Sequence, residues 1–242
     1  MTVHTIVPAL ALSGQGRRLC ALEHLGERTL LAHLLETLHQ IGLSQPLVLV
    51  PAQKADQVSD IDLPPHRVVT VPGADPDRRE GLRCALAELG SAGPEQTVMI
   101  HDAERALVPA DTIQAVLEAD DPSSVDGVVP VIDMTDSVKA VRSEGLVNID
   151  RSTLATVQCP RLLRRSVLDD ALAQPAPAQA GCGAGHGMFD EVQAGLARGA
   201  RLRTVPGTHR GFAIADRLSL WQAQIALGIA RDTTHRHGIS RR

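Results

Sequence analysis

Short apolar runs alternate along the chain with stretches whose apolar residues recur at helical spacing. In residues 29–41, five leucines fall on one face of a helix and Thr29 stands at the N-cap position. The predicted strands are 3–10, 46–50, 67–71, 97–100, 127–132 and 201–205, and the predicted helices are 29–41, 78–89, 110–119, 164–173, 189–198 and 216–231. This alternation predicts an α/β fold with a doubly wound, mostly parallel sheet that helices cover on both faces.

One segment departs from this pattern. Residues 137–149 alternate in polarity around turn residues at 143–145, which predicts a β-hairpin or arm that projects from the sheet at about 137–152. Residues 174–187 are rich in Pro, Ala and Gly and predict a flexible loop, beyond which the sheet pattern continues. The chain is therefore expected to form a single domain over residues 1–235, with a basic tail at 236–242.

Composition narrows the classes of function. Hydrophobic residues make up 43% of the 242 residues, so the chain can bury a full core. A net charge of -4 and only three aromatic residues argue against a nucleic-acid binder. No apolar run is long enough to span a bilayer, and the four cysteines are scattered. We expect a cytoplasmic protein with reduced thiols that binds neither nucleic acid nor membrane.

A glycine turn directly follows the first predicted strand. Gly14 and Gly16 would let backbone N–H groups approach a phosphate, and Arg17 and Arg18 would add charge-assisted hydrogen bonds. The spacing fits neither a dinucleotide fingerprint nor a Walker loop. A tight turn with solvated arginines explains these residues equally well.

Two further polar segments end predicted strands. Asp102 follows the strand 97–100, where an acidic residue can hold a ribose hydroxyl or a metal-bound phosphate, or can cap the next turn. Residues 136–139 (Asp-Ser-Val-Lys) and the pair Asp150-Arg151 flank the predicted arm. They could reach a neighbouring subunit or form a surface ion pair of little consequence.

Taken in order, these features resemble the 2-C-methyl-D-erythritol 4-phosphate cytidylyltransferase family over nearly the whole chain. The most specific segments are His-Asp-Ala-x-Arg at 101–105, Asp-Ser-Val-Lys at 136–139 and Val-Gln-x-Pro at 157–160. The resemblance implies a Rossmann-like, nucleotide-diphospho-sugar transferase-like fold. It also implies transfer of CMP from CTP to 2-C-methyl-D-erythritol 4-phosphate, a step of isoprenoid precursor synthesis, or to a related sugar-alcohol phosphate.

The resemblance also implies roles for single residues. Arg18 and Arg151 would be catalytic, and Mg²⁺ would enter with CTP and be bound by Asp102. A homodimer clasped through its β-arms would bring in Arg151 from the second subunit. The nucleotide would be bound by Gly14, Gln15, Gly16, Arg17, Arg78, Gly81 and Asp102, and the acceptor phosphate by Arg105, Ser137, Arg151 and Cys159.

Several positions of this predicted pocket depart from the family pattern. The Pro-Lys pair that the family places after the glycine turn is absent, and the only lysines are Lys54 and Lys139. Arg28, Arg161 and Arg210 are candidate replacements. Other changes are Gly81 for Ser, Cys159 for Thr, Arg161 for Gln, Phe189-Asp190-Glu191 for Thr-Asp-Asp and Ala213-Ile214-Ala215 for Lys-Ile-Thr.

Three hypotheses follow from the resemblance and the departures. The first is a cytidylyltransferase or related nucleotidyltransferase whose activity the missing lysines would weaken. The second is a catalytically degenerate homologue that acts as a nucleotide-binding or regulatory dimer. The third is a guanylyl- or sugar-nucleotide transferase of the same fold, which the arm segment disfavours.

Overall fold

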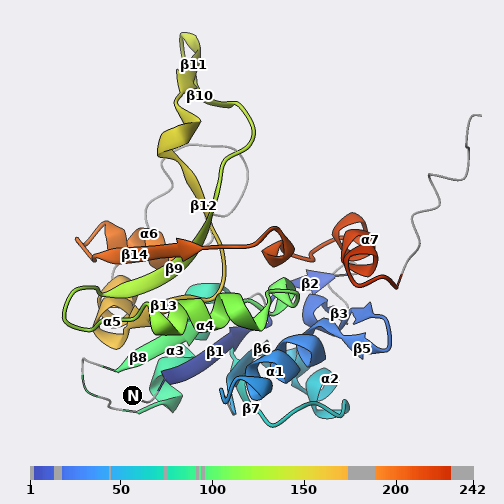
Figure 1. Cartoon of the computed structure of the whole chain (residues 1–242). Coiled ribbons are helices and arrows are strands. Elements are labelled where there is room, and N and C mark those ends of the chain that lie inside the picture. Colours follow the sequence, from blue (N-terminus) through green and yellow to red (C-terminus); the bar gives the residue numbers. More distant parts are fainter. Residues whose placement is uncertain are drawn as a thin grey trace, which may run out of the picture.

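A mixed eight-stranded sheet forms the centre of the computed structural model, which describes residues 3–13, 18–43, 45–73, 76–90, 93, 96–173 and 189–229 (Figure 1). Four strands at one side run parallel, in the order β7 (Arg67–Val71), β6 (Leu47–Pro51), β1 (Val3–Pro8) and β8 (Thr97–Ile100). The sheet then continues through β13 (Arg161–Arg164), β9 (Gly127–Asp133) and β14 (Leu202–Pro206). Strand β13 is antiparallel to both neighbours, whereas β14 is parallel to β9.

The predicted elements are confirmed with small shifts at their ends. Their bounds are α1 (Leu30–Gln40), α3 (Arg78–Glu88), α4 (Ala110–Glu118), α5 (Arg165–Ala173), α6 (Glu191–Leu196) and α7 (Arg217–Ala226). The hydroxyl of Thr29 accepts a hydrogen bond from the Ala32 backbone N–H, as its N-cap position predicts. The last helix ends at Ala226, earlier than predicted.

Two apolar layers bury the two faces of the sheet. Leucines of α1 and Ile113 of α4 pack on one face with Val7 of β1, and Leu82 of α3 and Leu168 of α5 pack on the other with Ile6. Neighbouring residues of β1 thus point into opposite layers, as a strand buried on both sides requires. The doubly wound α/β architecture is confirmed.

Strand β9 is the junction of the second half of the sheet. Its first residues pair with β13, and its last residues pair with β12 (Ala155–Val157), which is antiparallel to it. Residues 158–160 link β12 to β13 and include a cis Cys159–Pro160 bond. A methyl group on Gly127 would lie 2.5 Å from the Leu162 carbonyl oxygen, so β9 and β13 can approach closely only because this residue is glycine.

The predicted arm is present. Strands β10 (Val138–Arg142) and β11 (Gly145–Ile149) form an antiparallel hairpin that projects from the end of β9 (Figure 1). Within the described part of the chain, no helix is both long and apolar enough to cross a membrane. The predicted loop at 174–187 and the basic tail at 236–242 lie outside the described residues.

Short elements complete the chain near the first strand. Strand β2 (Leu12–Ser13) pairs with β3 (Arg18–Leu19), and β4 (His24–Leu25) pairs with β5 (Arg28–Thr29). A small helix, α2 (Ala55–Ser59), follows β6. The sequence pattern predicted none of these elements because each is too short to show a period.

Candidate functional site

The candidate site begins where β8 ends beside β1. Asp102 follows β8 after the fully buried His101, whose backbone N–H donates to the Ile6 carbonyl of β1. A short 3₁₀ helix, η3 (Ala103–Arg105), comes next and turns the chain away from the sheet. Asp102 therefore stands at the carboxyl ends of parallel strands, where α/β sheets bind their ligands.

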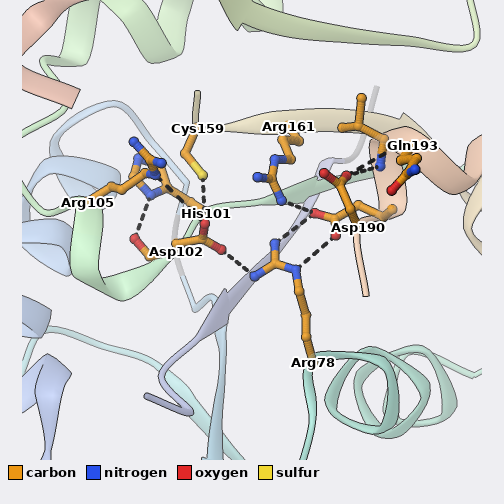
Figure 2. A network of polar contacts seen from close by, with 10 residues as sticks. Arg78, His101, Asp102, Arg105, Cys159, Arg161, Asp190 and Gln193 are labelled. Carbon is orange, nitrogen blue, oxygen red and sulfur yellow. Dashed lines mark hydrogen bonds and ion pairs between the residues drawn. The ribbon is translucent and has the colours of Figure 1, made fainter. Parts of the chain in front are cut away.

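Arg78 reaches this carboxylate from the start of α3. The helix is capped by Asp77, whose side chain accepts a hydrogen bond from the Glu80 backbone N–H, so the first helical residue has a fixed position. Arg78 Nη1 lies 2.5 Å from Asp102 Oδ1 (Figure 2). Its Nε and Nη2 bind Glu191 at 2.8 Å and 2.7 Å in a two-pronged contact.

Glu191 enters the site as the first residue of α6. Asp190 caps this helix by accepting hydrogen bonds from the backbone N–H groups of Val192 and Gln193. The side chain of Glu191 is fully buried, and its Oε1 also accepts from Arg161 Nη1 at 2.7 Å. Two guanidinium groups from distant parts of the chain thus converge on one carboxylate.

The second oxygen of Asp102 faces another set of groups. Cys159 Sγ lies 3.2 Å from Asp102 Oδ2, and Arg105 Nε lies 3.9 Å from it (Figure 2). Arg105 also donates to the carbonyl oxygen of Gly211 in η5 (His209–Gly211). The link between β12 and β13 therefore brings Cys159 and Arg161 to the same end of the sheet as Asp102.

Charge pairing dominates the titration of this cluster. Burial alone would raise the pKa of Asp102, but the guanidinium groups of Arg78 and Arg161 outweigh burial and hold that pKa well below its usual range. The pKa of Glu191 is lowered in the same way, against burial, by the same two arginines. Both carboxylates are ionised at neutral pH.

Two neighbouring groups, His101 and Cys159, stay neutral at pH 7, and a third, Glu104, titrates near that pH. Burial lowers the pKa of His101 to about 4 and raises the pKa of the Cys159 thiol to about 12. Burial also raises the pKa of Glu104 to about 7. Oε1 of Glu104 is shielded from solvent and has no hydrogen-bond partner among the described residues.

The cluster carries an excess of positive charge. Arg78, Arg105 and Arg161 face the two ionised carboxylates of Asp102 and Glu191, so three positive charges meet two negative ones, and the partial ionisation of Glu104 offsets part of this excess. The three arginine side chains keep 10–21% of their surface exposed, whereas Glu191 keeps none. An anionic ligand can therefore approach the arginines at a partly open edge of the cluster.

A cavity of about 460 Å³ is linked to this cluster through η3 but shares no lining residue with it. It is lined by Leu12, Ser13, Cys20, Glu23, Ile214, Ala215, Asp216, Arg217 and Leu220. The backbone N–H of Ile214 donates to the Glu104 carbonyl, and Cys20 Sγ donates to the Ile214 carbonyl. The cavity and the Asp102 cluster thus flank η3, and Ser13 extends the cavity to the start of the predicted glycine turn.

The other residues predicted to bind the nucleotide occupy different environments. Gly14, Gln15, Gly16 and Arg17 lie outside the described residues, and Arg18 is exposed on β3. Gly81 is buried in α3, where an added methyl group would lie 3.0 Å from Leu10 Cδ1 and 3.2 Å from Leu49 Cδ1. The structure therefore places Gly81 against the apolar core and not among the charged groups.

The predicted acceptor residues divide into two groups. Arg105 and Cys159 lie beside Asp102, as expected for one site. Ser137 and Arg151 are exposed at the base of the arm, and Arg151 donates to the Thr135 carbonyl oxygen. Of the candidate replacements for lysine, Arg161 joins the cluster, and Arg28 and Arg210 are exposed on β5 and η5.

Sequence reasoning missed two acidic members of the site. Glu191 was noted only as a departure from the family pattern, and Glu104 was not singled out. Glu191 meets Arg78 although 113 positions separate them. The sequence carries only a weak signal for Glu191, because an acidic residue right after an N-cap usually faces solvent and interacts with the helix dipole.

No group of three or more His, Cys, Asp or Glu side chains among the described residues is arranged to hold a metal ion. Mg²⁺ commonly needs only one or two carboxylates, with phosphate oxygens and water as its other ligands. Asp102 supplies one carboxylate, and Oε1 of Glu104 has no hydrogen-bond partner among the described residues, so these two groups fit this smaller requirement.

Comparison with protein families gives one match over most of the chain. The family model described as IspD, 2-C-methyl-D-erythritol 4-phosphate cytidylyltransferase, matches residues 3–229. A protein of that name from Saccharopolyspora erythraea is 33% identical over 241 residues, covering 94% of this chain and 100% of the relative. The bifunctional enzyme IspD/IspF of Clavibacter michiganensis is 32% identical over 234 residues, and the match spans 91% of this chain but 53% of that enzyme.

Solved structures resemble the fold closely. A 4-diphosphocytidyl-2C-methyl-D-erythritol synthase aligns with a TM-score of 0.72 at 22% identity, covering 93% of this chain and 99% of that one. A 2-C-methyl-D-erythritol 4-phosphate cytidylyltransferase from Thermus thermophilus aligns with a TM-score of 0.67 at 23% identity, covering 93% and 98%. At this level of identity the structural likeness concerns the fold.

Proposed function

We propose a function for this chain on the basis of its family. The match over residues 3–229 shows that the chain belongs to the 2-C-methyl-D-erythritol 4-phosphate cytidylyltransferase family. The proposed reaction is transfer of CMP from CTP to 2-C-methyl-D-erythritol 4-phosphate or a related sugar-alcohol phosphate, for isoprenoid precursor synthesis. A cytoplasmic location and the absence of nucleic-acid partners stay predictions.

One observation supports the proposal most directly. Arg78, Arg105 and Arg161 converge around Asp102 at the carboxyl ends of β1 and β8, and a cavity linked to this cluster through η3 reaches Ser13. A phosphate oxygen of the acceptor would attack the α-phosphorus of CTP in line, a P–O bond would form, and pyrophosphate would leave. Catalysis of this kind depends on positioning and charge neutralisation, which guanidinium groups supply.

The remaining assignments follow the same proposal. The turn at 14–17 and Arg18 would hold the triphosphate, and Arg105 and Cys159 would face the acceptor. Asp102, with the Glu104 carboxyl oxygen, would hold Mg²⁺, which neutralises phosphate charge when it is bound with CTP. The neutral state of His101 and Cys159 leaves them as packing and hydrogen-bonding groups around Asp102.

The arm supports a homodimer as part of this proposal. Val141 and Leu146 are 85% and 70% exposed on a two-stranded hairpin, and such a hairpin is marginal when it stands alone. A second copy of the chain would cover these residues and bring Arg151 of the partner subunit towards the acceptor. Replacing Val141 with Asp should turn a dimer into monomers in sedimentation velocity, and an unchanged dimer would contradict this use of the arm.

The structure also favours a second candidate function on one specific ground. Glu191 already pairs with both Arg78 and Arg161, and the chain lacks the family's lysines. A catalytically degenerate homologue that binds a nucleotide as a regulatory dimer would share these properties.

A turnover assay separates the two candidates. The protein is incubated with CTP, Mg²⁺ and 2-C-methyl-D-erythritol 4-phosphate, and pyrophosphate release is measured beside calorimetry of CTP binding. Release above the rate without acceptor supports the enzyme. CTP binding without release, across several acceptors, supports the degenerate homologue, and neither binding nor release contradicts both.

A further inference from the structure

The Glu191 carboxylate lies in a position that suits a phosphate group. Arg78 presents Nε and Nη2 as a fork, and Arg161 adds Nη1 to the same oxygen, Oε1, that Nη2 contacts. Forked contacts of this kind are how arginines bind carboxylates and phosphates. An internal anion thus fills a place where a ligand anion of similar size could bind.

Glu191 does not satisfy all the hydrogen-bond donors of Arg78 and Arg161. Arg161 Nε is buried and has no hydrogen-bond partner among the described residues. The two arginine side chains keep 10% and 13% of their surface exposed, so the pair has an open edge. Arg164, which pairs with Asp120, also has a buried Nε without a partner among the described residues, so what sets the Arg78–Arg161 pair apart is its remaining exposed surface and its shared carboxylate.

We propose that Glu191 is a specificity-determining residue, an internal carboxylate that competes with a ligand phosphate for Arg78 and Arg161. The inference rests on the proposed function for the class of ligand, a phosphate oxyanion of a nucleotide or acceptor. It implies that the native site disfavours any ligand whose phosphate must take this place. Removal of the Glu191 charge opens the arginine pair to phosphates.

The test is the variant Glu191→Gln, titrated with inorganic pyrophosphate and inorganic phosphate in a calorimeter. The amide oxygen can still accept from Arg78 Nη2 and Arg161 Nη1, so two of the three contacts are kept while the charge is lost. Because two arginine charges are then uncompensated by Glu191, we expect pyrophosphate to bind at least about tenfold more tightly. Unchanged or weaker binding by the folded variant would overturn the proposal.

Two further variants localise the effect. Asp120→Asn removes another buried carboxylate, which pairs with Arg164, and should leave pyrophosphate affinity unchanged. The double variant Arg161→Gln/Glu191→Gln should lose the tenfold gain. A similar gain in Asp120→Asn, or a gain that persists in the double variant, contradicts the assignment to the Arg78–Arg161 pair.

Folding of the variant is checked first. If Glu191→Gln does not fold, Glu191→Asp is used, because its side chain keeps the charge but is one methylene shorter, which draws the carboxylate back from the arginines. It should bind pyrophosphate more tightly than the native protein by a smaller factor, and a folded Asp variant without any gain overturns the proposal. Pyrophosphate affinity is independent of turnover, so a protein without transferase activity that shows the gain upholds this inference while the proposed function fails.

Discussion

Among the described residues, two buried clusters of arginine and carboxylate differ in charge balance and access. In one, Arg164 of β13 pairs with Asp120 after α4 and also donates to the Thr97 hydroxyl, and both charged side chains are at most 5% exposed. In the other, three arginines share the carboxylates of Asp102 and Glu191 at an open edge. The first is a closed, balanced pair, and the second has spare positive charge.

This difference distinguishes buried charges that stabilise the fold from buried charges that can bind a ligand. A balanced pair without solvent access ties α4 to β13 and β8 and has no capacity for a ligand. In an unbalanced cluster, buried charges lose their hydration without being fully paired. Such a cluster is retained where a further anion can bind. The two clusters lie at opposite ends of the same strand, since Arg161 begins β13 and Arg164 ends it.

The largest expected effect tests the balanced pair. Asp120→Asn leaves the Arg164 charge buried with no counter-ion, and we expect the free energy of unfolding to fall by about 3–5 kcal/mol. Urea denaturation followed by circular dichroism measures this loss. Turnover per folded molecule should not change. A variant of native stability would show that Arg164 finds other partners, and the pair would then not be structural.

The matching change in the open cluster is Asp102→Asn. Arg78 keeps its two-pronged contact with Glu191, so we expect a smaller loss of stability than for Asp120→Asn. Turnover should fall by ~10²–10³-fold, the range for removal of one preorganised polar group at a reacting phosphate or carbonyl. Comparing kcat/KM with the urea midpoint separates the two effects. If Asp102→Asn unfolds as readily as Asp120→Asn with turnover intact, the comparison fails.

The smallest effect concerns Glu104, at the border of the open cluster. Its pKa rises from an ordinary 4.5 to about 7 on burial, so the folded state holds a proton that the unfolded chain has released. Stability is therefore complete below pH 4.5 and declines as pH rises through 7. Glu104→Gln should remove this decline and stabilise the protein at pH 8 by roughly 2–3 kcal/mol.

Denaturation curves at pH 5 and pH 8 check this prediction. At pH 5 the gain should shrink to about 1 kcal/mol or less, since the Glu104 carboxyl is protonated in the folded state and has only begun to cost stability through its ionisation in the unfolded chain. An equal gain at both values would point to packing and not to the carboxyl proton.

The regular elements could be predicted because periodicity reports local backbone structure. The five leucines of α1 and the cap at Thr29 carry that information within 13 residues. Strands β12 and β13 were missed, since the link at Gln158–Pro160 interrupts them and arginines flank the short Leu162–Leu163 run. The antiparallel part of the sheet was thus invisible to pattern alone.

The site was predicted in part for a similar reason. Asp102 could be placed because the carboxyl end of a parallel strand is a general binding position, whereas Arg105 followed from the family resemblance. The partners of Arg78 could not be placed, as Glu191 lies far along the chain and ion pairs leave no periodic trace. Family resemblance supplied Cys159, but the burial that keeps its thiol protonated follows from packing alone.

Gly127 illustrates how far from a site an essential position can lie. It touches no charged group of the cluster, yet any side chain there would collide with the Leu162 carbonyl and push β13 away from β9. Arg161 and Arg164, at the two ends of β13, would both be displaced. A genetic screen for loss of function should accordingly score this glycine as intolerant to substitution. That result would reflect the close spacing of β9 and β13 and not a contact with a ligand.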